Sequence, residues 1–252
     1  MKSVWQKDVE RPEFPPLKND VKTEILIIGG GISGILTAHF LHQRGVPYIM
    51  VEKDRICGGT TGNTTAKITF QHGLIYSKLL RSAGVENAQM YLYANRAAFD
   101  KYSELCRNID CDYEQVDNFV YSMDDGQKLE RELRTLDNLG VRASFMADLP
   151  LPFQTAGAVC LPDQAQFHPL KFAASIARNL KILEKTPARA FDGNTVLTDY
   201  GRIRAEKIIV ATHFPLINKH GFYFVKQYQS RSYVLALKNG PQLKGMYRDE
   251  AE

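Results

Sequence analysis

The sequence predicts an α/β protein in which a dinucleotide-binding domain with a parallel sheet is interrupted by part of a second, α+β domain. Three observations predict this fold class. A glycine-rich turn joins a short apolar strand to a helix, and a second buried strand ends in an acidic residue. A long block of helix and strand then separates these elements from a later apolar strand that returns to the first sheet.

The glycine-rich turn follows residues 25–28, an unbroken apolar run, mostly β-branched, that is typical of a strand buried on both faces of a parallel sheet. Gly29, Gly31 and Gly34 then form G-x-G-x-x-G, a pattern that alone occurs often by chance. Here the glycines also open the apolar helical segment 35–41, which is the context of a Rossmann-like dinucleotide site. The alternative is a glycine-rich connector that binds no ligand.

The three glycines have separate roles in such a site. Gly29 allows a tight turn, Gly31 lets the backbone approach a pyrophosphate, and Gly34 lets the helix pack close to the strand. The amides at the start of the helix, at Ile32 and Ser33, would hold the phosphates at the positive end of the helix dipole.

A second strand, residues 48–51, ends at Glu52 and is followed by Lys53. Its distance from the glycines is close to the roughly 20 residues expected for the acidic partner of this turn. The Glu52 carboxylate can accept hydrogen bonds from both hydroxyls of a ribose. It would repel a 2′-phosphate, so the residues favour FAD or NAD over NADP.

The composition is that of an ordinary globular protein with one or two domains. The 252 residues are 44% hydrophobic and 24% charged, and a net charge of +4 argues against a nucleic-acid-binding platform. No apolar run reaches the roughly 18 residues of a membrane span, and the N-terminus lacks the apolar core of a signal peptide. We therefore expect a cytoplasmic protein.

The four cysteines have no C-x-x-C spacing. They are Cys57, Cys106, Cys111 and Cys160. We expect reduced, mostly buried thiols and no metal site, with a structural metal or a disulfide as the alternative.

Two segments flank the predicted dinucleotide unit. Residues 1–22 are rich in proline and charge, which predicts an extended arm on the surface. Residues 55–67 hold three glycines and four threonines, and such a segment exposes amides and hydroxyls that suit a polar cofactor. A flexible surface loop is the alternative for this segment.

The middle of the chain reads as an inserted second domain. Apolar spacing predicts a helix over 76–107 with a break at Gly84, a strand over 113–123, and a charged amphipathic helix over 127–139 that Gly140 ends.

The later chain returns to the first sheet. A strand at 156–160 leads to a helix over 170–180 opened by Pro169. Strands follow at 186–191, 195–199 and 202–205, then a buried apolar strand at 207–213 and a strand candidate at 227–238, with no closing element. The expected division is an arm at 1–22, a dinucleotide domain at 23–100 and 155–218, and a partial second domain at 101–154 and 219–252.

Five motifs together resemble a known family. They are IIGGGISGILTAHFLHQRG with IMVEK, GGTTGNTTAKIT, QFHPLKFAASIA, IIVATHFP and SRSYVLALK. Over nearly the whole chain they are similar to the D-amino-acid-oxidase-like family of FAD-dependent oxidoreductases, and closest to bacterial members that often carry a C-terminal Rieske domain. The resemblance implies an FAD domain of two-dinucleotide-binding-domain type, a substrate domain on an antiparallel sheet, and oxidation of C–N bonds in amines or amino acids by hydride transfer to flavin.

The resemblance also implies which residues hold FAD. Gly29, Gly31 and Gly34 would hold the pyrophosphate and Glu52 the ribose, while the segment from Gly59 to Lys67 passes toward the flavin ring. The backbone near Pro187 and Ala188 would contact adenine, and Ala211 and Thr212 would pack against the cofactor. The remaining expected cofactor residues are Ile32, Ser33, Lys53, Thr60, Thr61, Asn63, Thr64, Thr65 and Ala66.

The sequence indicates catalytic residues less clearly, because the oxidation of an amine by flavin mainly requires side chains that position the substrate. Lys67 could stabilise reduced flavin or be a solvated lysine, and His213 could approach the flavin or be structural. Arg231 and Tyr233 share a strand face that could point into a substrate cavity, although a salt bridge is as good an interpretation for Arg231. His168 is interpreted as a capping or structural residue.

Family members run on for well over a hundred further residues, so the chain reads as the amino-terminal part of a longer protein. Three hypotheses follow: an oxidoreductase of small amines or amino acids, a dinucleotide-binding fragment without catalysis, and an NAD-dependent reductase. Exposed sheet edges would also favour a homo-oligomer.

Overall fold

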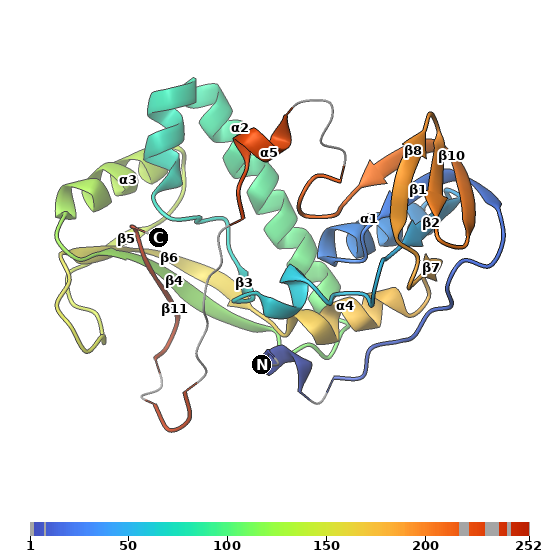
Figure 1. Ribbon diagram of the computed structural model, residues 1–252. Coiled ribbons are helices and arrows are strands. Elements are labelled where there is room, and N and C mark those ends of the chain that lie inside the picture. The colour runs from blue at the N-terminus through green and yellow to red at the C-terminus, as the bar shows by residue number, and fades with distance from the viewer. Residues whose placement is uncertain (1–2, 8, 217–221, 230–236, 241–242, 252) are drawn as a thin grey trace. The chain divides into compact units, whose positions relative to one another are not determined.

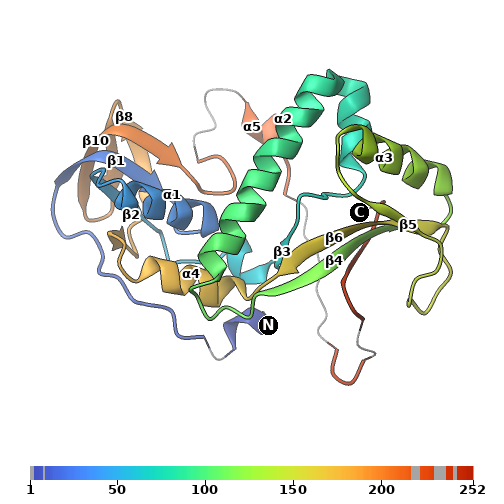
Figure 2. The same cartoon turned by 180° about the vertical axis from the view of Figure 1, so that it is seen from behind.

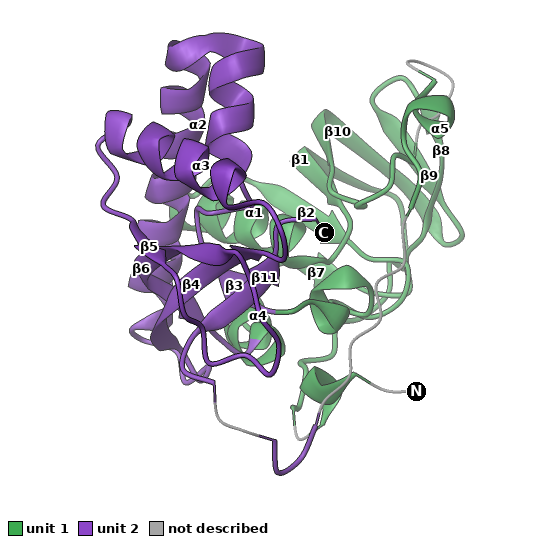
Figure 3. Ribbon diagram, turned by 90° about the vertical axis from the view of Figure 1, so that its left-hand side faces the viewer, with its two compact units in different colours: residues 1–65, 169–236 green, residues 66–168, 237–252 purple. Residues whose placement is uncertain are grey.

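The computed structural model describes residues 3–7, 9–216, 222–229, 237–240 and 243–251 (Figure 1). The chain forms two compact units (Figure 3). Unit 1 is Met1–Thr65 with Pro169–Ala236, and unit 2 is Ala66–His168 with Leu237–Glu252. This division differs from the expected one, because residues 66–100 and 155–168 form a helix and a strand that pack within unit 2.

Unit 1 is built on a parallel sheet. Its elements in chain order are η1 (Val4–Gln6), β1 (Val21–Ile28), α1 (Ile32–Gln43), β2 (Tyr48–Val51), η2 (Thr60–Asn63), α4 (Pro169–Ala177), β7 (Ile182–Leu183), β8 (Ala188–Asp192), β9 (Thr195–Thr198), β10 (Gly201–Val210) and α5 (Tyr223–Lys226). Among the described residues the sheet has six strands in the order β7-β2-β1-β10-β9-β8. The first four strands run parallel, and β9 and β8 continue as an antiparallel hairpin.

The core of unit 1 confirms the prediction for the first strand. Residues 25–28 of β1 are all buried, and α1 packs against β1, β2 and α4. The N-terminal arm takes part in this core through Leu17, which is 3% exposed and contacts the cluster around Leu26 and Ile49. The sequence patterns did not predict that Leu17 anchors the N-terminal arm in this core.

The returning strand differs from its prediction in two ways. The segments predicted at 202–205 and 207–213 contribute to a single strand, β10. This strand pairs in parallel with β1, and Ile25 lies opposite Lys207. The strand ends at Val210, which is 41% exposed, and none of residues 207–210 is buried, so the expectation of a buried strand over 207–213 was wrong. The buried residues of β10 are Ile203 and Ala205, which face the same core cluster as Leu17.

Unit 2 is an α+β unit with a largely antiparallel sheet, as predicted. Its elements are β3 (Lys67–Ile68), α2 (Ile75–Cys106), β4 (Glu114–Ser122), α3 (Gly126–Asn138), β5 (Ser144–Met146), β6 (Gly157–Gln166) and β11 (Met246–Asp249). The strand order is β11-β4-β6-β3, with β5 also paired to β6, and only β11 joins in parallel among the described pairs. Helices α2 and α3 cover one face of this sheet (Figure 2).

Sequence patterns located the helices of unit 2 well. The predicted break at Gly84 is present, with φ 82° and ψ 170° inside α2. Strand β6 continues to Gln166, beyond its predicted end at residue 160. The expectation that no element closes the chain was wrong, because β11 pairs with β4. Residues 227–229 are not in a strand, and the rest of that strand candidate lies largely outside the described residues.

Within the described part of the chain, no helix has both the length and the apolar character that a bilayer crossing requires.

The start of α2 depends on a buried carboxylate. Glu132 of α3 is 0% exposed and accepts hydrogen bonds from the amides of Tyr76, at 2.9 Å, and Ser77, at 2.8 Å. The charge therefore satisfies two N–H groups that have no partner inside the helix.

We predict that Glu132→Ala lowers the free energy of unfolding by about 2 to 4 kcal/mol, because two buried amides lose a charged acceptor. Glu130→Ala, two residues away in α3, removes only an exposed pair with Arg134 and should cost about 0.5 kcal/mol or less. Urea denaturation of both variants measures the difference. Equal losses in the two variants would contradict the assigned role of Glu132.

Candidate cofactor-binding site

The glycine turn of unit 1 has the tight geometry that the sequence predicts. Gly29 has φ +114°, and a Cβ placed on it would lie 2.5 Å from the Ala211 carbonyl oxygen at the end of β10. A Cβ on Gly34 would lie 2.0 Å from the Gly29 carbonyl oxygen, so α1 touches the turn directly. Both positions therefore require glycine on steric grounds.

Gly31 differs because the space beside it is open. It is the N-cap of α1 with φ −79°, and a Cβ there would meet only the Thr61 hydroxyl, at 3.5 Å. The absent side chain leaves a cradle in front of the first turn of a twelve-residue helix. The first turn carries N–H groups with no intrahelical acceptor, so the cradle suits a phosphate.

Thr61 lies at the same helix end. Its hydroxyl accepts a hydrogen bond from the Ile32 amide at 3.0 Å, and the residue is 8% exposed. The surrounding segment forms η2, in which the Asn63 side chain donates to the Gly59 carbonyl at 2.8 Å. The indole of Trp5 donates to the Thr64 carbonyl at 2.7 Å. This ordered geometry favours the cofactor segment over the flexible-loop alternative.

Glu52 points back toward the glycine turn. One carboxylate oxygen accepts from the Gly30 amide at 2.7 Å and the other from the Asp54 amide at 3.0 Å. A carboxylate has about four acceptor sites, so capacity remains for ribose hydroxyls. Lys53, which follows, is exposed and lies 3.8 Å from the Asp54 carboxylate.

The two later segments also meet this region. The Thr186 amide donates to the Glu52 carbonyl at 2.8 Å, which brings Pro187 and Ala188 next to the end of β2. The Ala211 amide donates to the Ile28 carbonyl at 2.8 Å, which holds Ala211 and Thr212 beside Gly29. Unit 1 thus brings together the expected cofactor residues of five separate segments; Ala66 belongs to unit 2.

Sequence reasoning missed Glu184, a second carboxylate of this region. It is 1% exposed, accepts from the Ile56 amide at 2.7 Å, and forms an ion pair with Arg55 at 3.1 Å. It also accepts from the Phe14 amide at 3.3 Å, which ties the N-terminal arm to the segment after Glu52. The available signal was an acid that follows a short apolar strand, as Glu52 follows β2.

Cys57 lies beside the turn and is buried. Burial raises the pKa of its thiol to about 12, against a smaller opposite effect of Arg11, and its sulfur lies 3.8 Å from the Gly30 carbonyl. All four cysteines are free and buried. The described residues contain no group of three or more His, Cys, Asp or Glu that could hold a metal.

The catalytic candidates fall in different units. The Lys67 ammonium donates to the Tyr247 carbonyl at 3.1 Å within unit 2. His213 is exposed in unit 1 with φ +66°, and His168 is buried with its amide donating to Cys111. Arg231 and Tyr233 lie outside the described residues.

A comparison with protein families decides the assignment. The model of a family described as FAD dependent oxidoreductase, DAO, matches residues 24–250. The chain belongs to this family. It is 33% identical over 261 residues to the "Putative Rieske 2Fe-2S iron-sulfur protein YhfW" of Bacillus subtilis (strain 168), covering 97% of this chain and 51% of the relative. It is 24% identical to the gamma-glutamylputrescine oxidoreductase of Escherichia coli (strain K12), covering 79% of this chain and 50% of that protein.

Solved structures share the fold of this family member. The L-proline dehydrogenase from P. horikoshii has a TM-score of 0.65 at 22% identity, covering 85% of this chain and 58% of its own. The glycine oxidase from Geobacillus kaustophilus has a TM-score of 0.59 at 18% identity, covering 76% and 55%. The chain spans about half the length of the curated relatives it matches.

We predict that Gly34→Ala lowers the free energy of unfolding by about 1 to 3 kcal/mol or prevents folding, because its methyl group has no space against the Gly29 carbonyl. Ser33→Ala, at the neighbouring exposed position, should change it by about 0.5 kcal/mol or less. Thermal and urea unfolding measure both. A Gly34→Ala protein as stable as the Ser33→Ala protein would contradict the close packing of α1.

Proposed function

We propose that unit 1 binds FAD at the glycine turn and that the protein to which this chain belongs oxidises a C–N bond of a small amine or amino acid. The observation that carries the proposal is the cradle at Gly31, open in front of α1 and beside the Glu52 carboxylate. Membership of the FAD dependent oxidoreductase family supports it.

Each segment of the site has a proposed part in holding the cofactor. The turn and the first amides of α1, at Ile32 and Ser33, would bind the pyrophosphate, and Glu52 with Lys53 would face the adenosine ribose. The backbone at Pro187 and Ala188 would contact adenine. The segment from Gly59 to Ala66, which includes Thr60, Thr61, Asn63, Thr64 and Thr65, would follow the pyrophosphate, and Ala211 with Thr212 would pack against the cofactor.

FAD, when bound, supplies the acceptor for the hydride that the substrate loses. The task of the protein is then to orient a neutral amine and to exclude water from the reacting carbon. Lys67, His213, Arg231 and Tyr233 remain candidates for this positioning. Two relatives whose names specify amine or amino-acid substrates, the gamma-glutamylputrescine oxidoreductase and the L-proline dehydrogenase, support this substrate class.

A second candidate function is dinucleotide binding without catalysis by this chain alone. It is favoured by the coverage of only about half of each curated relative.

We further propose a reducing cytoplasm as the compartment, since the four thiols are free. We also propose a homo-oligomer that forms through exposed sheet edges. Light scattering tests the oligomer.

We predict that Gly31→Ala folds but weakens FAD binding by about tenfold or more. The added methyl meets no atom closer than 3.5 Å in the fold but occupies the cradle for the pyrophosphate. Gly126→Ala is the matched control, because its Cβ would also meet a single oxygen at 3.5 Å, in unit 2. Titration of FAD by flavin fluorescence measures both variants, and equal affinity for Gly31→Ala and Gly126→Ala would reject the site.

We predict that the purified chain is yellow or takes up FAD, and that an amine substrate bleaches the flavin absorbance without oxygen. The full family-length protein is the positive control. Uptake of FAD without bleaching by any amine or amino acid tested would support the binding-only candidate. Competition of NAD against FAD in a thermal-shift measurement separates both from an NAD-dependent reductase, which FAD would not stabilise.

A further inference from the structure

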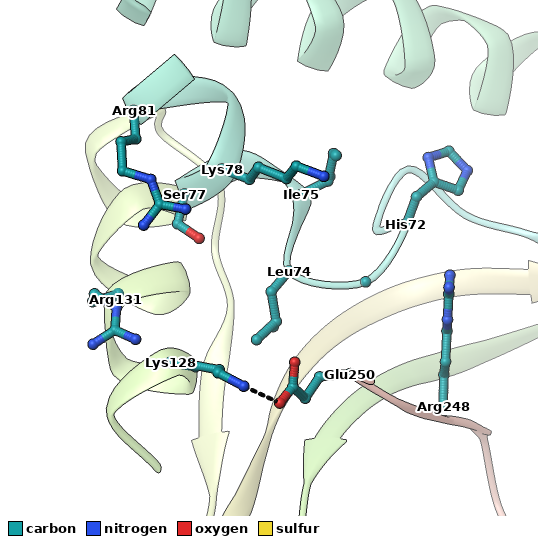
Figure 4. Close-up of a pocket in the computed structure, with 11 residues that line it drawn as sticks. His72, Leu74, Ile75, Ser77, Lys78, Arg81, Lys128, Arg131, Arg248 and Glu250 are labelled. Carbon is teal, nitrogen blue, oxygen red and sulfur yellow. Dashed lines mark hydrogen bonds and ion pairs between the residues drawn. The ribbon is translucent and has the colours of Figure 1, made fainter. Parts of the chain in front are cut away.

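A basic pocket of about 350 Å³ lies within unit 2, between the start of α2, the start of α3 and β11 (Figure 4). Five cationic side chains line it: Lys78 and Arg81 from α2, Lys128 and Arg131 from α3, and Arg248 from β11. One acid, Glu250, is among the lining residues. A cavity of this volume has the size of a small-molecule site.

Arg248 of β11 and Glu250, which follows the strand, line the pocket. Side chains alternate along a strand, and Tyr247 stacks on Phe119 at 4.7 Å on the opposite face. Arg248 and Glu250 therefore project together toward the helices. Gly73 lies beside this group, because a Cβ on it would be in ordinary contact with the Arg248 guanidinium carbon, at 3.9 Å.

The acids near the pocket do not neutralise it. Glu250 pairs with Lys128 at 2.7 Å, and Asp125 lies 4.0 Å from the same ammonium. Glu132, behind the pocket wall, is occupied by the amides of Tyr76 and Ser77. Among the described residues, the five cations that line the pocket outnumber the four acids in or near it, which are Glu250, Asp125, Asp124 and Glu132. The pocket should therefore attract an anion, and this electrostatic attraction is stronger in a concave site than on a flat surface.

The cationic side chains lie on two sides of the pocket. Arg81 and Arg131 extend from α2 and α3, whereas Arg248 lies on the other side near His72 (Figure 4). Burial and the Arg248 charge lower the pKa of His72, and its ring lies 2.9 Å from the Tyr91 hydroxyl. His72 is thus a neutral hydrogen-bonding group. Leu74 and Ile75 add apolar surface between the two sides.

We propose that this pocket binds a small molecule with at least two anionic oxygen groups, carboxylate or phosphate, one held by Arg81 and Arg131 and the other by Arg248. Guanidinium groups bind both kinds of oxyanion through paired N–H donors. The concave shape with an apolar portion suits a small molecule better than the backbone of a nucleic acid. This site goes beyond the proposed function and does not depend on FAD binding.

The test is isothermal titration calorimetry of the chain with inorganic pyrophosphate and with citrate, at fixed low salt and with FAD in excess. At least one probe should bind, and preference for one distinguishes phosphate from carboxylate ligands. The double variant Arg81→Gln with Arg131→Gln, and Arg248→Gln alone, should each weaken binding roughly tenfold or more. Arg248→Lys, which keeps the charge but loses the paired donors, should lie between Arg248→Gln and the unaltered chain.

The matched control is Arg96→Gln, an exposed arginine of α2 that is not among the residues lining the pocket. It should leave the affinity unchanged, and thermal unfolding should be the same for all variants. Binding of neither probe would overturn the proposal, as would equal weakening by Arg96→Gln. Loss of pyrophosphate binding in Gly31→Ala but not in the arginine variants would place the anion at the glycine turn instead. Duplex DNA that binds more tightly than either probe would identify a nucleic-acid surface.

Discussion

The close approach of α1 to the first strand is the constraint on which unit 1 depends. The Gly29 carbonyl oxygen lies where a Cβ of Gly34 would be, and the Ala211 carbonyl lies where a Cβ of Gly29 would be. Backbone therefore meets backbone at the junction of β1, α1 and β10. This contact fixes the amino end of α1 at Gly31, where the missing side chain leaves open space beside the Thr61 hydroxyl.

Carboxylates at the ends of adjacent strands then organise the surrounding segments. Glu52 after β2 binds the amides of Gly30 and Asp54, and Glu184 after β7 binds the amide of Ile56 and the Arg55 side chain. Both acids accept from backbone N–H groups, which are charge-assisted bonds and stronger than neutral ones. The N-terminal arm joins the same network through Phe14 and Leu17. The cofactor region is thus fixed by hydrogen bonds to loops as well as by its glycines.

Local patterns predicted what depends on local chemistry. The glycine turn, the acid at Glu52 and the break at Gly84 each follow from the residue types at a few neighbouring positions. Strand β11 was missed because four residues carry too little pattern, and its partner β4 lies far away in the sequence. Glu184 and Leu17 were missed for the same reason, since only the folded chain brings them to Ile56 and Leu26. The expected division differs from the two compact units where residues 66–100 and 155–168 pack by long-range contacts within unit 2.

The pairing of β11 with β4 has a consequence for biosynthesis. Ser122 and Glu250, at the ends of these strands, are separated by 128 positions, and the intervening chain includes much of unit 1. Closing so long a loop is entropically costly, and proteins dominated by such contacts fold slowly. During translation, the edge of β4 that pairs with β11 can form these hydrogen bonds only after residue 249 has left the ribosome.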